Sequence, residues 1–321
     1  MEKAFFDKHL KGFEYIIMGC MKPKVSVVIP TVEEESVFKL VRQIRTILGR
    51  NTEIIIVDKS SDAYFKRLKA TGAKIIRQKG RGVENAVMIG LREAKGEYIA
   101  SIDADGTHDP KGLAEALKLV ESGKADFVLG NRMSGLTKGS MQLYIRFGNG
   151  MLSWLYSTLY HTKIHDVLTG LFVVKREAFE EIRNIEPYRA GIAFFAIELA
   201  RRGYTVKEVG IKYYKRTYGE SKLTRSKFAY GFNVASHIVR QLRDYSPLLV
   251  FGLVGGILFI IGLILGIFVL ASFISTGVFA FAGRALLAFM LLVVGFVLIT
   301  AGLILDLLLE IERRMEMNNS K

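Results

Sequence analysis

Two carboxylates stand one residue apart in the stretch SIDADGTHDP at residues 101–110, directly after an apolar run typical of a buried strand. At the carboxyl end of a parallel strand, Asp103 and Asp105 could share a hard divalent cation with the diphosphate oxygens of a nucleotide. The alternative is turn chemistry, because Asp is common in strand-to-helix loops and Asp109 before Pro110 makes a good helix N-cap. Taken alone, the motif favours the turn, so the surrounding elements must decide.

Strands and helices are predicted to alternate along residues 24–223. Apolar and β-branched runs predict strands at 25–30, 53–58, 73–77, 97–103 and 125–130, and further strands within 166–175 and 204–211. Helical spacing of apolar residues predicts helices at 37–48, closed by Gly49, within 82–94, and within 191–203. This alternation indicates an α/β fold with a mainly parallel sheet.

Acidic residues recur where these strands end. Glu34, Asp58, Asp103 and Asp105 fall at or just beyond the carboxyl ends of three predicted strands. Because such ends meet at one edge of a parallel sheet, we expect these carboxylates to lie in one site that binds a nucleotide and a metal ion. This agreement argues against the turn alternative.

The helix within 82–94 has small residues four apart, at Gly82, Ala86, Gly90 and Ala94. Such a face lets a helix backbone approach a sheet or a ligand closely, although helix propensity alone could place alanines there. Close packing is the favoured interpretation.

Two apolar segments, about 247–270 and 285–308, are each long enough to cross a bilayer, and Arg284 is the only charged residue from Pro247 to Leu305. We interpret them as a transmembrane hairpin; the alternative is a buried pair of core helices. Basic residues flank both segments, at Arg240, Arg243, Arg313 and Arg314. By the positive-inside rule, a multi-pass protein of the cell membrane with a cytoplasmic catalytic domain and C-terminus is expected.

The formal charge of +14 and the isoelectric point near 9.7 fit anionic lipids and anionic substrates. No helix-turn-helix, zinc or ribonucleoprotein motif is recognised, so nucleic acid is not an expected partner. The single cysteine, Cys20, excludes an internal disulfide and fits a reducing compartment. Residues 1–20 lack the apolar core of a signal peptide; they could form an amphipathic segment, or the chain could start at Met21.

Two aromatic, amphipathic stretches, at 144–161 and 224–243, could be core helices or could lie in the plane of a membrane interface. Between them, a basic cluster at 212–225 could be a solvated loop or a site for a lipid phosphate. Its position before the membrane segments favours the phosphate site.

Several motifs occur together in order along residues 24–225. They are Pro30-Thr31-Val32-Glu33-Glu34, Val57-Asp58-Lys59-Ser60-Ser61-Asp62, the small-residue helix, Asp103-Ala104-Asp105, Gly130-Asn131-Arg132, Asp166-x2-Thr169-Gly170 and Arg216-x2-Gly219-Glu220-Ser221-Lys222. In this combination the chain resembles the family 2 inverting glycosyltransferases with the Rossmann-like nucleotide-diphospho-sugar transferase (GT-A) fold, most closely the dolichyl and polyprenyl phosphate sugar synthases.

Three positions depart from the pattern of that family. Val32 replaces an aromatic residue beside the nucleotide, Lys59 replaces a carboxylate of the base-side motif, and Thr107 replaces a glutamine that helps to hold the metal. The Gln-x-x-Arg-Trp motif of processive polysaccharide synthases is missing, since Trp154 is preceded by Gly150-Met151-Leu152-Ser153. A polymer synthase is therefore not expected.

The resemblance implies transfer of a hexose from GDP-mannose, UDP-glucose or UDP-N-acetylglucosamine to dolichyl or polyprenyl phosphate, with inversion, for glycosylation. The alternatives are extension of a lipid-linked oligosaccharide and a non-catalytic membrane scaffold. Magnesium or manganese ion is the implied cofactor, and the bilayer an implied partner. The residues implied are Asp105, Arg132, Arg146, Arg216 and Lys222 for catalysis; Pro30, Thr31, Glu34, Asp58, Asp103, Ala104 and Asp105 for the nucleotide sugar; Arg146, Ser221 and Lys222 for the acceptor phosphate; Asp105, Asp103 and Thr107 for the metal; and, less directly, Glu198 or Asp166 for sugar hydroxyls.

The expected domain organisation follows from these motifs. An N-terminal extension (1–23) precedes the GT-A domain (24–223), and an amphipathic juxtamembrane helix (224–245) leads to two transmembrane helices within 246–310 and a cytoplasmic tail (311–321).

Overall fold

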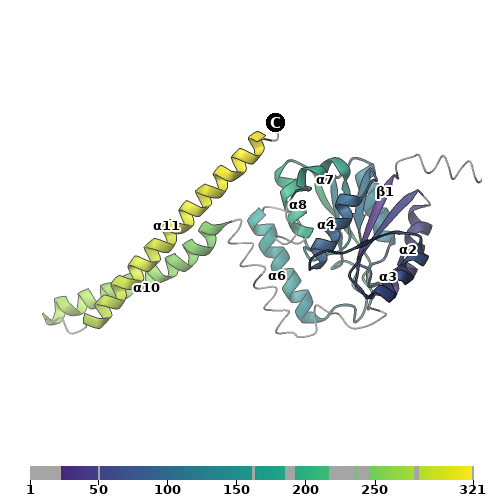
Figure 1. Cartoon of the computed structure of the whole chain (residues 1–321). Helices are drawn as coiled ribbons and strands as arrows, with labels where there is room; N and C mark the ends of the chain where they lie inside the picture. The colour runs from purple at the N-terminus through teal and green to yellow at the C-terminus, as the bar shows by residue number, and fades with distance from the viewer. Residues whose placement is uncertain are drawn as a thin grey trace, which may run out of the picture. The chain divides into compact units, whose positions relative to one another are not determined.

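The computed structural model of the chain describes residues 23–49, 51–160, 163–184, 192–216, 236, 246–277 and 282–319 (Figure 1). The chain divides into an N-terminal unit, Met1–Lys227, and a C-terminal unit, Phe228–Lys321. Apart from Pro23 and Ser236, the predicted N-terminal extension and juxtamembrane helix lie outside the described residues.

The described part of the N-terminal unit is built on a seven-stranded sheet in the order β3-β2-β1-β4-β6-β5-β7. The strands are β1 (Val25–Thr31), β2 (Thr52–Asp58), β3 (Lys74–Arg77), β4 (Tyr98–Ser101), β5 (Phe127–Asn131), β6 (Phe172–Lys175) and β7 (Val206–Gly210). Strand β6 runs antiparallel to β4 and β5, and the other neighbouring pairs are parallel. The predicted α/β class with a mainly parallel sheet is confirmed.

Strand β4 ends earlier than the sequence predicted, at Ser101 rather than Asp103. The backbone amide of Ile102 still donates to the carbonyl of Val28 on β1, at 3.1 Å, and the chain then turns into the Asp103–Asp105 loop. Hydrogen bonding to the central strand therefore holds the root of the acidic loop.

Helices cover both faces of this sheet. They are α2 (Ser36–Leu48), α3 (Asp62–Leu68), the short 3-10 helix η1 (Lys69–Thr71), α4 (Val83–Glu93), α5 (Lys111–Glu121), α6 (Leu143–Tyr160), α7 (Arg176–Ile182) and α8 (Ile192–Arg201). Side chains alternate across a strand, so Val27 and Ile29 of β1 join the core under α2 and α5, while Val28 points to α4.

The apolar face and the C-terminal end of helix α2 follow the predicted pattern. Its apolar positions Val37, Leu40, Val41 and Ile44 are buried, and Gly49 terminates it with a φ of 86°. The left-handed region is open to glycine at little steric cost, so this residue closes the helix as expected.

The small-residue face of α4 makes the close approach that was predicted at Gly90. A Cβ atom at Gly90 would lie 2.2 Å from Cγ1 of Val28, so the helix sits directly on β1. Gly82 does not belong to that face: it is the N-cap of α4, with a φ of 92°. Glycine is needed at position 82 for its backbone conformation rather than for close packing.

The C-terminal unit contains the helices α10 (Pro247–Thr276) and α11 (Ala282–Asn319), which lie side by side (Figure 1). Their apolar parts, Pro247–Thr276 and Ala282–Ile311, are 30 residues long, and an 18-residue stretch within each has a mean hydropathy of 3.1 and 2.8, respectively. At 1.5 Å per residue, each spans about 45 Å, more than the hydrocarbon core of a bilayer. Both helices are longer than predicted, and α11 continues through Asn319, where a tail was expected.

Glycines allow the two long helices to touch. A Cβ atom at Gly255 would lie 2.7 Å from the carbonyl oxygen of Gly295, and one at Gly262 would lie 2.9 Å from that of Ala288. Small residues at a helix contact are typical of packing in lipid, where close van der Waals contact rather than the hydrophobic effect holds helices together. The helices are long and apolar enough for membrane association.

Candidate active site

The carboxylate of Asp105 is held in place by its own loop. Its Oδ1 accepts hydrogen bonds from the backbone amide of Thr107, at 3.1 Å, and from the Thr107 hydroxyl, at 2.7 Å. Gly106 between them has a φ of 73°, and the hydroxyl of Ser36 donates to the Asp105 carbonyl at 3.3 Å. Thr107, predicted as a metal ligand, thus turns its hydroxyl to Asp105 and orients that carboxylate.

Arg216 joins this loop to the end of strand β1. One guanidinium nitrogen donates to Oε1 of Glu34, and another lies 3.9 Å from Oδ2 of Asp105. The segment that carries Arg216 is held beside the acidic loop, because the backbone amide of Tyr214 donates to the Thr107 carbonyl at 2.7 Å. Two acids from separate strand ends therefore face one cation, all three side chains being mostly shielded from solvent.

Asp103 packs closely against Gly170 on one side, although its side chain is 33% exposed, compared with 23% for Asp105. A Cβ atom at Gly170 would lie 2.2 Å from Oδ2 of Asp103, so only glycine fits beside this carboxylate. Burial, followed by repulsion from Asp105, raises the pKa of Asp103 to about 7. The predicted Asp103, Ala104 and Asp105 motif is therefore packed against the Thr169-Gly170 turn, which itself was recognised as a motif.

His108 was not predicted as a site residue. It lies beneath the acidic loop, 2% exposed, with Nδ1 3.7 Å from Oδ2 of Asp103 and its ring edge-on to Tyr213 at 5.2 Å. Burial lowers its pKa to about 4, with Arg132 contributing, so the imidazole is neutral near pH 7. Its place three residues after Asp105 is the signal that sequence reasoning could have used.

Arg132, predicted to contact phosphate, has a strong partner within the chain. Its Nε and one terminal nitrogen each donate to Asp166 at 2.7 Å, and its backbone amide donates to the same carboxylate at 2.9 Å. The amide of Asn149 adds a further hydrogen bond of 2.9 Å to Asp166. Burial would raise the pKa of Asp166, but the charge and hydrogen bonds of Arg132 outweigh it and hold that pKa below its usual value.

The Arg132–Asp166 pair is connected to the acidic loop through one aromatic ring. The guanidinium carbon of Arg132 lies 5.4 Å from the centre of the Tyr213 ring, whose other neighbour is His108. Tyr213 is held by its own backbone, because its amide donates to Gly135 at 2.9 Å. The ring thus separates the buried ion pair from the loop that carries Asp105.

Asp58, predicted to hold the nucleoside, is fully buried at the end of β2. It accepts hydrogen bonds from the amide and hydroxyl of Ser60, and from Arg77 at 3.2 Å. Arg77 was missed, although it ends β3 in register with Asp58. The neighbouring Glu33 has a φ of 53°, and its amide donates to the Ser60 hydroxyl at 2.6 Å.

Pro30 and Thr31 end strand β1 beside this group, in register with Val57 and Asp58. The amide of Lys59 donates to the Thr31 carbonyl at 3.2 Å, while its ammonium group donates to the Gly80 carbonyl at 2.6 Å. Lys59, one of the departures from the family pattern, is thus tied to the glycine-rich loop before α4.

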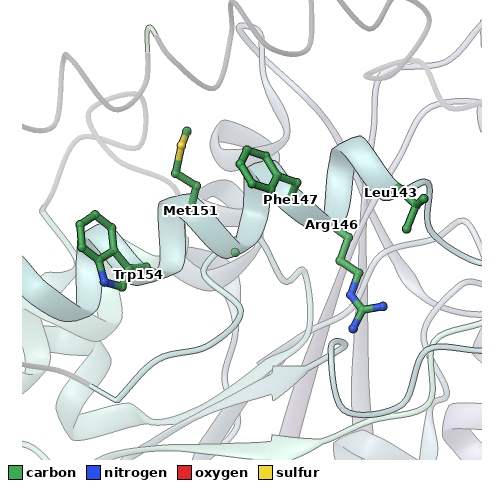
Figure 2. A pocket seen from close by; sticks show the side chains of 6 residues that line it. Leu143, Arg146, Phe147, Met151 and Trp154 are labelled. Atoms are coloured by element: carbon green, nitrogen blue, oxygen red, sulfur yellow. The ribbon is translucent and has the colours of Figure 1, made fainter.

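The remaining predicted residues fall elsewhere. Arg146 is on helix α6, where it lines an open groove with other residues of that helix (Figure 2). Glu198 is on α8, where it accepts a hydrogen bond from Arg202 at 2.9 Å. Ser221 and Lys222 lie outside the described residues.

Within the described ranges, no group of three or more His, Cys, Asp or Glu side chains is arranged to hold a metal ion. Asp103 and Asp105 nevertheless offer hard carboxylate oxygens, the ligands that Mg²⁺ and Mn²⁺ take. A cation there would need further oxygens from a bound ligand. The donor set therefore fits an ion that binds together with phosphate groups.

Comparison with known proteins identifies a family and several relatives. The chain matches Glycosyl transferase family 2 over residues 26–183. The dolichyl-phosphate hexose transferase of Haloferax volcanii is 31% identical over 211 residues, which cover 65% of this chain and 89% of that protein. The dolichol-phosphate mannosyltransferase of Pyrococcus furiosus is 29% identical over 235 residues, 68% of this chain and 64% of that protein.

Another relative in Haloferax volcanii, the low-salt glycan biosynthesis hexosyltransferase Agl6, is 29% identical over 228 residues. The alignment covers 68% of this chain but 54% of Agl6, so this chain spans about half of that relative's length.

Among solved structures, glucosyl-3-phosphoglycerate synthase from Mycobacterium tuberculosis, crystallised with Mn²⁺, UDP and phosphoglyceric acid, is similar with a TM-score of 0.50 and 18% identity. The match covers 70% of this chain and 79% of that one, and supports the GT-A fold. The family match and these relatives agree with the carboxylates at the strand ends. The chain therefore belongs to the family 2 glycosyltransferases, is similar to the dolichyl-phosphate sugar synthases, and is an enzyme of glycosyl transfer.

Proposed function

We propose that this enzyme transfers a hexose from a nucleotide diphosphate sugar to dolichyl or polyprenyl phosphate, with inversion at the anomeric carbon. The observation that carries the proposal is Arg216, which lies between Glu34 and Asp105 at the carboxyl edge of the sheet. Acidic and basic side chains there suit a site that binds phosphates and a cation together. The names of the relatives in Haloferax volcanii and Pyrococcus furiosus support the substrate class.

In this proposal the nucleoside lies over the ends of β1 and β2. Pro30, Thr31 and Glu34 border it on β1, and Asp58 stands on β2 with its carboxylate already oriented by Ser60. A preorganised acceptor costs little reorganisation when a base or ribose donates a hydrogen bond to it.

Asp105 and Asp103 would hold Mg²⁺ or Mn²⁺ against the donor diphosphate. When bound, the ion would neutralise charge on the departing nucleotide diphosphate. The relation between Thr107 and Asp105 supports this role, because the hydroxyl fixes Oδ1 of the carboxylate at 2.7 Å. Asp103 contributes a carboxylate whose charged form a cation would favour.

The acceptor needs little help from a general base. The second pKa of a phosphate monoester is about 6, so its oxygen is largely anionic at pH 7. That oxygen attacks the anomeric carbon as the bond from this carbon to the diphosphate oxygen breaks, and the electron pair leaves with the nucleotide diphosphate. Arg216, Arg146, Lys222 and Ser221 are the proposed phosphate contacts, and Arg132 is a further candidate that also binds Asp166.

The lipid acceptor would be brought to the enzyme by membrane association. Helices α10 and α11 have the length and apolarity for it. We place the catalytic domain and C-terminus on the cytoplasmic side, in agreement with the arginines that flank these helices in the sequence.

The deciding assay uses the purified full-length protein in lipid vesicles with polyprenyl phosphate and separate GDP- and UDP-sugars. Mass spectrometry of the lipid fraction should find a lipid-phosphate hexose with one donor. A product in which the sugar is attached to an added lipid-linked oligosaccharide, with none on the lipid phosphate, would refute the proposed acceptor.

A further inference from the structure

Tyr213 follows strand β7 and lies where two loops of the active site meet. Its amide donates to the Gly135 carbonyl at 2.9 Å, and its own carbonyl accepts from the amide and the hydroxyl of Thr137, at 3.0 and 2.8 Å. On the side of the acidic loop, its backbone forms a β-bridge with His108. Main-chain contacts on both sides therefore fix the path of the chain at position 213.

The side chain of Tyr213 connects Asp105 to Arg132. Its ring packs edge-on to His108 at 5.2 Å, and the guanidinium carbon of Arg132 lies over the ring, 5.4 Å from its centre. Burial raises the pKa of Tyr213, while the charge of Arg132 and a hydrogen bond with the Thr107 side chain oppose this rise. Because the Thr107 hydroxyl donates to Oδ1 of Asp105 at 2.7 Å, a continuous line of contacts runs from Asp105 to Arg132.

Both ends of this line are fixed by other residues. The backbone amide of Thr107 also binds Asp105, and Asp166 accepts hydrogen bonds of 2.7 Å from Nε and one terminal nitrogen of Arg132. Within the described residues, the other terminal nitrogen of Arg132 has no hydrogen-bond partner, so it remains for a ligand. An aromatic ring has few torsions and is a stiff spacer, so the ring of Tyr213 sets the distance between two rigid groups.

We propose that Tyr213 is a positioning residue, which holds Arg132 at a fixed distance from Asp105. A phosphate group bound by the arginine and a cation bound by the carboxylate then keep a constant separation. The inference rests on the proposed function, in which one phosphate attacks the sugar carbon while the donor diphosphate leaves. The reacting atoms must be held close and in line, and a displacement of about 1 Å can cost about 10²-fold in rate. Tyr213 touches no substrate in this scheme and acts through Arg132.

Steady-state kinetics of the full-length protein with polyprenyl phosphate tests the role of the ring. Tyr213→Leu removes the ring and should lower kcat by about 10²-fold, with KM for the sugar nucleotide close to that of the unchanged protein. Tyr213→Phe keeps the ring and should recover most of the loss. Tyr214→Leu removes the neighbouring, exposed ring and is the matched control, with unchanged kcat. If Tyr213→Phe or Tyr214→Leu were as slow as Tyr213→Leu, the spacer role would be overturned.

The separation itself can be measured without turnover. Mn²⁺ bound with a nucleoside diphosphate relaxes the phosphorus NMR signal of a nearby polyprenyl phosphate, and this relaxation falls steeply with distance. In the full-length protein in detergent, Tyr213→Leu should weaken the relaxation, while Mn²⁺ affinity measured by electron paramagnetic resonance stays the same. Equal relaxation in the two proteins would overturn the proposal. Lost Mn²⁺ affinity would do so too, since the ring would then support the acidic loop alone.

A double-variant cycle tests whether Tyr213 acts through Arg132. In the background of Arg132→Lys, the further change Tyr213→Leu should lower kcat little, because the group that the ring positions has already been altered. Losses that multiply in the double variant would make the two residues independent and refute the role. Should Tyr213→Leu fail to fold, Tyr213→Met, whose flexible side chain fills much of the same space, replaces it with the same expectation.

These measurements separate the inference from the proposed function. If bound Mn²⁺ relaxed no polyprenyl phosphate in the unchanged protein, the proposed acceptor would be refuted, and the inference with it. If the unchanged protein showed relaxation and transfer, and Tyr213→Leu kept both in full, the inference alone would be refuted.

Discussion

The guanidinium of Arg132 and the carboxylate of Asp166 face each other with paired hydrogen bonds of 2.7 Å, and the Arg132 backbone amide adds a third contact. The Arg132 side chain is 10% exposed and that of Asp166 is fully buried. The pair joins the end of β5 to the turn before β6. It therefore holds these two segments together beside Tyr213.

Removing one member of this pair should lower the free energy of unfolding substantially. Asp166→Ala leaves the Arg132 charge buried without its partner, and a broken buried pair typically costs about 3–5 kcal/mol. Chemical denaturation of the full-length protein in detergent would measure it. Lys175→Ala, which breaks the more exposed pair with Asp126, is the control and should cost about 1 kcal/mol or less. Equal losses for both variants would contradict this assignment.

Asp105→Ala should abolish sugar transfer while the protein stays folded. The physical reason is that Asp105 presents the best oriented carboxylate to a cation, through its bonds to Thr107. Binding of Mn²⁺ with nucleotide diphosphate, followed by electron paramagnetic resonance, should be lost as well. Asp109→Asn is the matched control: the Asp109 carboxylate accepts a hydrogen bond from the Lys111 amide at 3.0 Å, and the asparagine amide oxygen can still accept it. Normal activity of Asp105→Ala in EDTA would refute the metal site.

Arg216→Gln should lower kcat, because it removes the positive charge that we propose contacts the donor diphosphate. Removing one preorganised donor to a developing negative charge typically costs about 10²- to 10³-fold. Steady-state kinetics with the nucleotide sugar would measure the loss, and Arg67→Gln, which affects an exposed pair with Glu35, is the control. A change confined to KM for the lipid would instead place Arg216 on the acceptor alone.

Gly170→Ala should displace Asp103, because the new Cβ would lie 2.2 Å from its Oδ2. We expect lost transfer together with a lower melting temperature. The double variant Gly170→Ala and Asp103→Ala keeps the new Cβ but removes the carboxylate that it would meet, so it should recover melting temperature but not activity. If the double variant were less stable than the sum of the two single changes, the steric explanation would be wrong.

The raised pKa of Asp103 predicts how the stability of the metal-free protein depends on pH. Its value is about 7 in the folded protein and near 3.8 when unperturbed, so between these pH values the folded state binds more protons than the unfolded state. Stability should therefore fall as pH rises from about 4 to about 7. The side chain is 33% exposed, so solvent should make the effect smaller than that of a sealed carboxyl.

Melting curves in EDTA across this pH window would test the Asp103 effect. Asp103→Asn cannot ionise, and should flatten the pH dependence and raise the melting temperature at pH 8. An unchanged slope in this variant would assign the pH dependence to other groups.

Much of the fold could be predicted from local pattern. The continuous apolar runs of β1 and β2 are typical of strands buried on both faces, and Val37, Leu40 and Ile44 recur with the period of a helix; the structure confirms both. The hairpin segments were recognisable because a bilayer demands a long apolar run without charge. Strand ends could not be predicted as well: β4 ends at Ser101, and the next residue, Ile102, is held by a hydrogen bond to Val28 of β1 that no local pattern specifies.

The sequence by itself determined which acids could meet: Glu34, Asp58, Asp103 and Asp105 follow strand ends, and parallel strands bring their carboxyl ends to one edge. Only the tertiary structure decided their partners. Arg216 reaches Glu34 across 182 residues, and Arg132 takes Asp166 across 34. The free energy of a buried charge is lowest beside an opposite charge, and which charges become neighbours depends on chain crossings rather than on spacing.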